Sequence, residues 1–185
     1  MREQVVDFTK PFMGSGIAAI MKTRHLTQLG IRSVRDLAHQ STMKYGVIDG
    51  AATKDFFRMS ADPDYVRMWA EIATHSGQVR TMEEGIERVL ASSDEHPWAL
   101  LSETAALSAQ ETCDTTIVSS DTSRGHALAT PPGDTYMQDR LTLAILEMIE
   151  DGDLTALRLK WFQPPDCDHS ANGAAGAKRF LSPPQ

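Results

Sequence analysis

The chain has 185 residues, of which 41% are hydrophobic and 23% are charged, and its net charge is −7 at neutral pH. This size and composition suit one globular domain or two small lobes. The acidic balance, without any run of Lys and Arg, argues against a nucleic-acid partner. No segment approaches the roughly 20 consecutive apolar residues of a membrane-spanning helix. The N-terminus also lacks the apolar core of a secretory signal, so the chain as written is expected to be soluble and untargeted.

Short strands and helices are expected to alternate along the chain. Six segments predict strands: 5–8, 16–21, 44–48, 98–101, 115–118 and 126–130. Six predict helices, beginning at Ser33, at Ala52 or Thr53, at Pro63 and at Met82, and covering 137–150 and 154–162. Pro11 and Gly14 predict a turn, and residues 22–30, which are polar without a clear period, predict a connection. The alternation indicates α/β layering.

The clearest helix start is Asp62–Pro63, an N-cap residue followed by proline in the first turn. Beyond it, apolar residues recur at helical spacing and predict one buried face: Tyr65, Met68, Trp69, Ile72 and Ala73. A capping box from Thr81 to Glu84 precedes a second apolar set: Ile86, Val89 and Leu90. The tail 170–185 is rich in Ala, Gly and Pro and is expected to be disordered.

The two cysteines allow two interpretations. Cys113 and Cys167 both lie in turn-rich segments, so a bond between them could attach the C-terminal segment to the body of the protein. Such a bond would stabilise the fold by roughly 4 kcal/mol on the chain-entropy model. Two free thiols are the alternative, and the residues alone leave both open.

Three residues are candidates for binding an α-amino acid. Thr53 follows a Gly–Ala–Ala turn after a strand, and the first N–H groups of the next helix form a ready anion site. Glu103 ends an apolar strand, where it could hold an ammonium group. Arg2 carries a planar guanidinium suited to a carboxylate. Taken singly, they read more simply as a helix cap, a solvated turn residue and an exposed terminal residue.

A family resemblance links these residues. Ten stretches carry it: VDFTKPFM (6–13), DLA (36–38), YG (45–46), ATKDFF (52–57), MW (68–69), EGIERVL (84–90), SRG (123–125), ATP (129–131), LAIL (143–146) and LKWF (159–162). In this order they make the segment from Arg2 to Cys167 resemble the ligand-binding domain of ionotropic glutamate receptors of the kainate and AMPA types.

The resemblance implies an α/β clamshell of the type II periplasmic-binding-protein class, truncated and without pore helices. Its first lobe would be fragmentary and its second nearly complete. The implied segments are a lobe 1 remnant and crossing strand (1–15), lobe 2 (16–130), helices returning to lobe 1 with a disulfide-tethered segment (131–169), and the tail. By the same resemblance, Arg2 binds the ligand α-carboxylate, Ala52 and Thr53 bind carboxylates, Glu103 holds the ammonium group, and Cys113 and Cys167 form a disulfide.

The implied function is that of a non-catalytic, glutamate-binding region of a ligand-gated cation channel subunit. It would need no cofactor or metal, would work with other receptor subunits, and would be the extracellular portion of a plasma-membrane receptor. The alternatives are a soluble amino-acid-binding protein of the solute-binding class and a soluble protein that modulates full-length receptors. We also expect the helices from Met137 to be loosely packed or to drive association, because Leu143, Leu146 and Leu157 would lack much of their partner surface.

Overall fold

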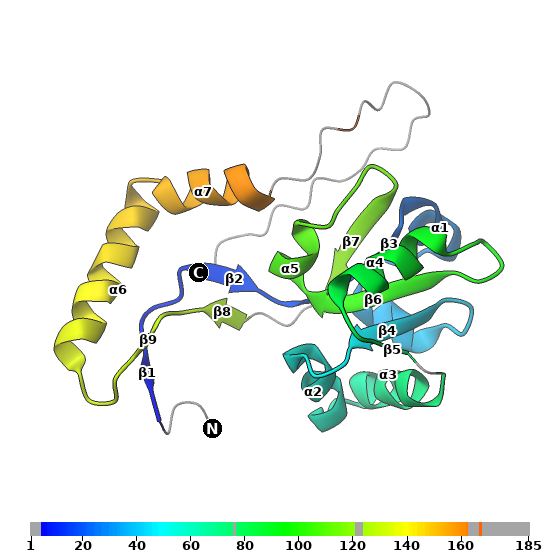
Figure 1. Cartoon of the computed structure of the whole chain (residues 1–185), viewed down its shortest axis with the longest axis horizontal. Helices are drawn as coiled ribbons and strands as arrows, with labels where there is room; N and C mark the ends of the chain where they lie inside the picture. Colours follow the sequence, from blue (N-terminus) through cyan, green and yellow to red (C-terminus); the bar gives the residue numbers. More distant parts are fainter. Residues whose placement is uncertain (1–4, 76, 121–123, 163–166, 168–185) are drawn as a thin grey trace. The chain divides into compact units, whose positions relative to one another are not determined.

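The computed structural model of the protein describes residues 5–75, 77–120, 124–162 and 167 (Figure 1). Its strands are β1 (Asp7–Phe8), β2 (Met13–Ser15), β3 (Ile17–Lys22), β4 (Lys44–Ile48), β5 (Gln78–Val79), β6 (Trp98–Glu103), β7 (Thr115–Ser119), β8 (Arg124–His126) and β9 (Ala129–Thr130). Its helices are α1 (Thr23–Leu29), the 3-10 helix η2 (Val34–His39), α2 (Ala52–Met59), α3 (Pro63–Thr74), α4 (Met82–Ala91), α5 (Thr104–Ser108), α6 (Thr135–Glu150) and α7 (Asp153–Phe162). The mixed α/β class predicted from the sequence is confirmed.

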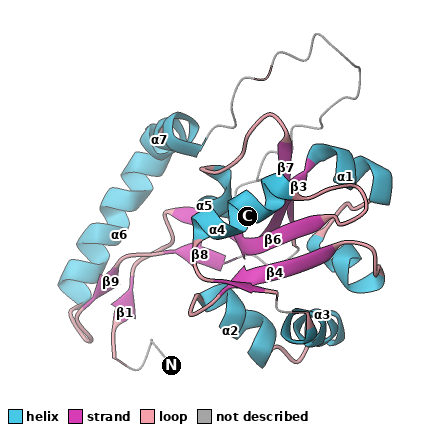
Figure 2. Ribbon diagram, turned by 45° about the vertical axis from the view of Figure 1, so that its right-hand side comes forward, coloured by secondary structure: helices cyan, strands magenta, loops and turns pink. Residues whose placement is uncertain are grey.

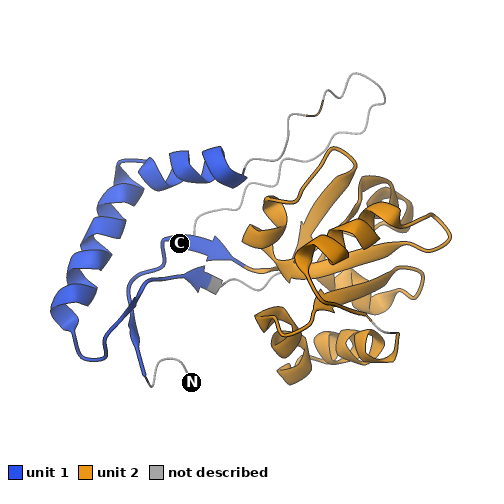
Figure 3. Ribbon diagram, viewed as in Figure 1, with its two compact units in different colours: residues 1–15, 123–163, 169–185 blue, residues 16–122, 164–168 orange. Residues whose placement is uncertain are grey.

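The chain divides into two compact units (Figure 3). The larger unit contains residues 16–122 and 164–168, and the smaller unit contains residues 1–15, 123–163 and 169–185. This division differs from the expected segment 16–130, because β8 and β9 pair with β2 and β1 inside the smaller unit. The tail 170–185, which we expected to be disordered, lies outside the described residues.

The larger unit is built on a five-stranded sheet with the strand order β5-β4-β6-β3-β7 (Figure 2). Strand β4 runs parallel to both β5 and β6, whereas β3 runs antiparallel to β6 and β7. The middle strands are apolar without interruption, since residues 17–21 and 98–101 are all buried. Continuous apolar strands of this kind indicate a sheet that is covered on both faces.

The two faces of the sheet carry separate apolar cores. Ile17, Ala19 and Met21 of β3 face a core to which α1, η2, α2 and α3 contribute, and Ala18 and Ile20 face a second core with α4 and α5. This follows from the two-residue period of a strand, which sends alternate side chains to opposite faces. The larger unit is therefore a sheet between two layers of helices.

The smaller unit is built from short antiparallel pairs and two helices. Strand β1 pairs with β9, and β2 pairs with β8. Two hydrogen bonds connect α6 and the turn before it to β1: Gln138 Nε2 donates to the Phe8 carbonyl (2.7 Å), and the Gly133 amide donates to Asp7 Oδ2 (2.7 Å). Burial is sparse, because Ile145 is the one buried residue of α6 and α7 has none.

Three local predictions from the sequence are wrong. Residues 22–30 are not a plain connection but contain α1, which ends at Gly30 in the left-handed conformation (φ 65°). Gly14 lies in β2 rather than in a turn, and the expected strand at 126–130 is replaced by β8 and β9. The helix at 22–30 was missed because it has seven residues and only two apolar ones, Leu26 and Leu29, that pack against the core. Strand β5 and helix α5 were not expected, since they have two and five residues.

Candidate functional site

The first part of the candidate site is the start of α2. Strand β4 ends at Ile48, and Gly50 then adopts a left-handed conformation (φ 75°) that turns the chain into the helix. The N-cap residue is Ala51, which forms no side-chain hydrogen bond to the helix. The first amides of α2 are therefore not capped by a side chain. Together with the helix dipole, they form an arrangement suited to an anion.

The side chains of this turn differ in burial. Thr53 is 3% exposed, whereas Ala52 is exposed. Further along α2, the buried Phe57 contacts Tyr65 of α3 edge to face (5.5 Å between ring centroids), and Phe56 packs against both rings. This aromatic cluster fixes α2 on the core, and it holds the N-terminus of the helix in a set position at the end of β4.

A charged pair flanks the same turn. Lys54 Nζ lies 2.6 Å from Asp49 Oδ1, and the hydrogen bond from Lys54 holds the pKa of the Asp49 carboxyl below its usual range. The positive charge of the lysine beside the first turn of α2 is thus balanced by the Asp49 carboxylate. Lys54 was not among the predicted site residues, and the signal for it in the sequence is the pair of opposite charges at positions 49 and 54, on either side of a glycine turn.

The second part of the site is the end of β6. Because β4 and β6 are parallel neighbours, with Val47 opposite Leu101, their carboxyl ends reach the same edge of the sheet. The turn into α2 follows one strand and Glu103 ends the other, so these two parts of the site lie at one edge. Ligands of such sheets gather at the carboxyl ends of the strands.

Glu103 is half-buried at the junction of β6 and α5. The neighbouring Thr104 fixes this junction, since its amide and its hydroxyl both donate to the Gly16 carbonyl (2.8 and 3.0 Å). The backbone at Glu103 is thereby fastened to β3. A carboxylate held in this way suits an ammonium group through a charge-assisted hydrogen bond.

Three of the four predicted ligand-binding residues lie in the described part of the larger unit, and the fourth is not among the described residues. Ala52, Thr53 and Glu103 all belong to the larger unit and follow or end adjacent strands. Arg2 lies outside the described residues. Among the residues that the structure describes, no group of three or more His, Cys, Asp or Glu side chains could hold a metal ion.

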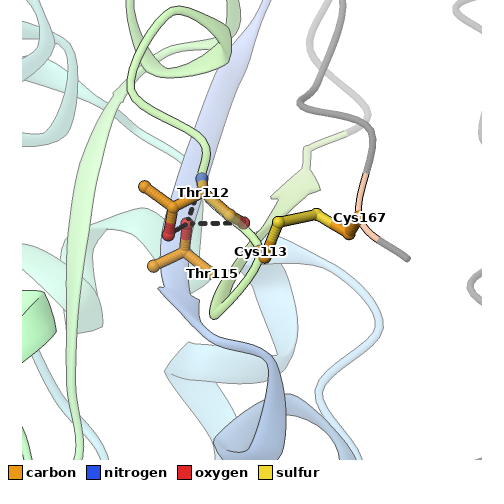
Figure 4. The surroundings of a disulfide bond; sticks show 4 residues. All are labelled: Thr112, Cys113, Thr115 and Cys167. Atoms are coloured by element: carbon orange, nitrogen blue, oxygen red, sulfur yellow. Dashed lines mark hydrogen bonds between the residues drawn. A yellow bond between two sulfur atoms is a disulfide. The ribbon is translucent and has the colours of Figure 1, made fainter. Parts of the chain in front are cut away.

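The predicted disulfide is present between Cys113 and Cys167, with 5.5 Å between their Cα atoms (Figure 4). Cys113 lies in a turn held by threonines: the Thr112 amide donates to Thr115 Oγ1 (2.8 Å), and the Thr115 amide donates to the Thr112 carbonyl (3.2 Å). Both cysteines belong to the larger unit. The bond thus fixes the residue at position 167 to the turn before β7.

Comparison with known proteins gives related sequences. The chain is 36% identical over 156 residues to "Glutamate receptor" of Lymnaea stagnalis, and this match covers 82% of the chain. It is 34% and 33% identical over 152 residues to "Glutamate receptor ionotropic, kainate 1" of Homo sapiens and Rattus norvegicus, and each match covers 80% of the chain. No family model matches.

The chain spans only about a sixth of the length of these relatives, 17% for the Lymnaea protein and 16% for the kainate proteins. All three are named as receptors rather than enzymes, in agreement with the prediction of a non-catalytic chain. None of the described helices is both long and apolar enough to cross a membrane. The chain therefore belongs to the family of ionotropic glutamate receptors, which includes the kainate type, and it is homologous to one segment of these proteins.

Proposed function

We propose that this chain is a glutamate-binding region of an ionotropic receptor subunit, and that Ala52, Thr53 and Glu103 contribute to its ligand site. The observation that carries the proposal is the shared edge of the sheet in the larger unit. An anion site at the start of α2 and a carboxylate at the end of β6 follow adjacent parallel strands there. An amino acid with a second carboxylate matches this pair of opposite charges.

In this proposal each group has one task. The first amides of α2 and the Thr53 hydroxyl donate to a carboxylate of the ligand. The Glu103 carboxylate accepts from the ligand ammonium group. From the sequence resemblance alone, Arg2 is assigned to the ligand α-carboxylate.

The architecture and the partners are proposed on the same basis. The larger unit corresponds to the second lobe of a type II periplasmic-binding-protein clamshell, and the smaller unit contains the returning helices and a remnant of the first lobe. The parent protein would be a plasma-membrane receptor that assembles from several subunits, with this portion outside the cell. Ligand binding shifts the equilibrium between the open and the closed clamshell only by as much as glutamate binds the closed state more tightly than the open state.

A titration with three ligands, followed by backbone amide NMR shifts, tests the site. L-glutamate should shift the amides of Ala52, Thr53 and Glu103. Glutarate lacks the ammonium group, so it should shift the start of α2 and leave Glu103 nearly unchanged. L-2-aminobutyrate lacks the side-chain carboxylate, so it should shift the Glu103 amide and leave the start of α2 nearly unchanged.

The outcomes of this titration separate cleanly. If all three ligands gave the same shifts, or if the shifts lay away from this edge of the sheet, the assignment of residues would be wrong. The absence of any saturable shift with L-glutamate at millimolar concentration would refute glutamate binding by this chain. A dissociation constant of about 1 mM corresponds to about 4 kcal/mol of binding free energy, so the titration covers binding as weak as this.

A further inference from the structure

The sequence Lys22-Thr23-Arg24-His25 at the start of α1 makes polar contacts with the loop that follows α4. Lys22 Nζ donates to the Ser92 carbonyl (2.7 Å), and Arg24 Nε lies 3.0 Å from Asp94 Oδ1. His25 Nε2 lies 3.2 Å from the same Asp94 oxygen. Three basic residues within four positions on one side, and two residues of one loop on the other, thus connect segments that are about 70 residues apart in the sequence.

His25 differs from its basic neighbours in its burial. Its side chain is 1% exposed, whereas those of Arg24 and Asp94 are 51% and 54% exposed. Because a carboxylate only accepts hydrogen bonds, Nε2 carries the proton that is donated to Asp94. The other ring nitrogen, Nδ1, is buried and has no hydrogen-bond partner within the described part of the chain.

This arrangement accommodates a neutral imidazole and disfavours a charged one. A proton added at Nδ1 would create a buried N–H group without an acceptor and a buried positive charge, and both cost free energy. We propose that the contact between α1 and the loop 92–97 is an acid-released latch, which is closed when His25 is neutral and opens when His25 is protonated.

The charges around His25 act in opposite directions. Burial lowers the pKa of His25 and is the largest effect; the hydrogen bond to Asp94 raises it, and the nearby cations Arg24 and Lys22 lower it. Glu95 and His96 of the same loop are exposed. Since the pKa in the closed state is below the unfolded value of about 6.5, the latch has its full stability above about pH 6.5 and loses it as the pH falls below that value.

Hydrogen exchange measured on the full chain tests the latch. Protection factors, which remove the intrinsic pH dependence of exchange, should fall in α1 and the loop 92–97 between about pH 7.5 and about pH 5.5. The protection factors can fall by about tenfold, because protonation of one histidine changes the opening equilibrium by about a factor of ten for each pH unit below the pKa in the unfolded state. In His25→Gln, whose amide can still donate to Asp94 but does not titrate, the fall should disappear.

Three matched variants control for other histidines. His39 and His75 are exposed and lie beside Asp64 and Glu71, and His96 lies in the loop itself. Substitution of each by glutamine should leave the fall in α1 unchanged. If His96→Gln removed it, or if His25→Gln kept it, the latch would be assigned to the wrong group.

A measurement on the unsubstituted chain covers the case in which His25→Gln does not fold. The His25 ring should titrate by NMR below pH 6.5 and with the same midpoint as the opening of α1. In Asp94→Asn, which removes the charge favouring protonation, this midpoint should move to lower pH. A His25 midpoint at or above 6.5, or an α1 whose exchange protection does not change with pH, would overturn the proposal.

Discussion

Thr53 combines a buried side chain with a position in the first turn of α2. Thr53→Val keeps the shape of this side chain and removes the hydroxyl, so a ligand carboxylate would lose one donor. We expect the dissociation constant for L-glutamate to rise about fivefold to tenfold, as one hydrogen bond contributes roughly 1 kcal/mol. Thr74→Val, on the exposed end of α3, is the control for titration calorimetry and should not change binding. Equal effects of both variants would contradict the assignment.

At Glu103 the charge itself is tested. Glu103→Gln keeps the size of the side chain but lowers its attraction for an ammonium group. The dissociation constant should rise about tenfold to a hundredfold, as expected for a hydrogen bond between charged groups. Glu87→Gln, at an exposed position of α4, makes the same change in net charge and should leave binding unaltered. A Glu103→Gln protein that binds as tightly as the original would remove Glu103 from the site.

Gly46 is required by close packing of backbone. A Cβ atom at this position of β4 would lie 2.0 Å from the Gly77 carbonyl oxygen, which accepts a hydrogen bond from Val47. Gly46→Ala should therefore lower the free energy of unfolding by about 2–4 kcal/mol. Gly14→Ala, where nothing lies within 4 Å of the added atom, is the control and should change it by less than about 0.5 kcal/mol. Chemical denaturation measures both, and equal stabilities would contradict this packing.

The sequence predicted individual core residues well where helical spacing was strong. Tyr65, Met68 and Ile72 of α3 are buried as predicted, but Ala73 is exposed and Trp69 is only partly buried. Spacing identifies the face of a helix that turns inward. It does not state how far the partner surface extends, because that surface is formed by other elements, η2, α2 and the sheet.

At the scale of elements, caps were the most reliable local signals. The Asp62 side chain accepts from the Asp64 amide at the start of α3, and Thr81 accepts from the Glu84 amide at the start of α4. The capping box of Ser33 and Asp36 is also present, although it begins a 3-10 helix. Caps act within four residues, so the sequence carries their whole cause. The polar contacts at the start of α1 reach residues about 70 positions away, so they left no local signal for this helix.

Helices α6 and α7 offer a test of local stability. Leu143 and Leu146 of α6 and Leu157 of α7 are 41–54% exposed, whereas Ile20 of β3 and Leu100 of β6 are fully buried. Amides in α6 and α7 should therefore exchange about tenfold or more faster than those of β3 and β6. Native-state hydrogen exchange measures this difference. Equal protection would contradict the prediction that these helices are loosely packed in the isolated chain.

At the scale of the whole molecule, local sequence patterns could not predict which segments belong to which of the two units. Strands β8 and β9 are short and leave the larger unit to pair with β2 and β1, which lie more than 100 residues earlier. The pairing depends on contacts between distant segments, and a strand of two or three residues does not encode its partner. The positions of Thr53 and Glu103 at one edge of the sheet were easier to predict from the sequence, because each residue follows or ends a predicted strand.

The disulfide should contribute to the stability of the larger unit. Cys113 and Cys167 are 54 positions apart, and closing a loop of this length limits the unfolded chain by up to about 4 kcal/mol on the loop-entropy model. Reductant should lower the melting temperature, and the double variant Cys113→Ser, Cys167→Ser should melt at the reduced value with or without it. A melting temperature that is the same in the oxidised and the reduced protein would contradict this expectation.

The same bond gives the molecule an unusual covalent topology. Between Cys113 and Cys167 the chain forms a closed ring that includes β8, β9, α6 and α7. Cutting a ring once opens it without dividing it, so a protease that cleaves a single peptide bond in this stretch would release no fragment. The nick would be visible on a denaturing gel only after reduction. Damage to the connection between the two helices could therefore accumulate while the oxidised protein keeps its full mass.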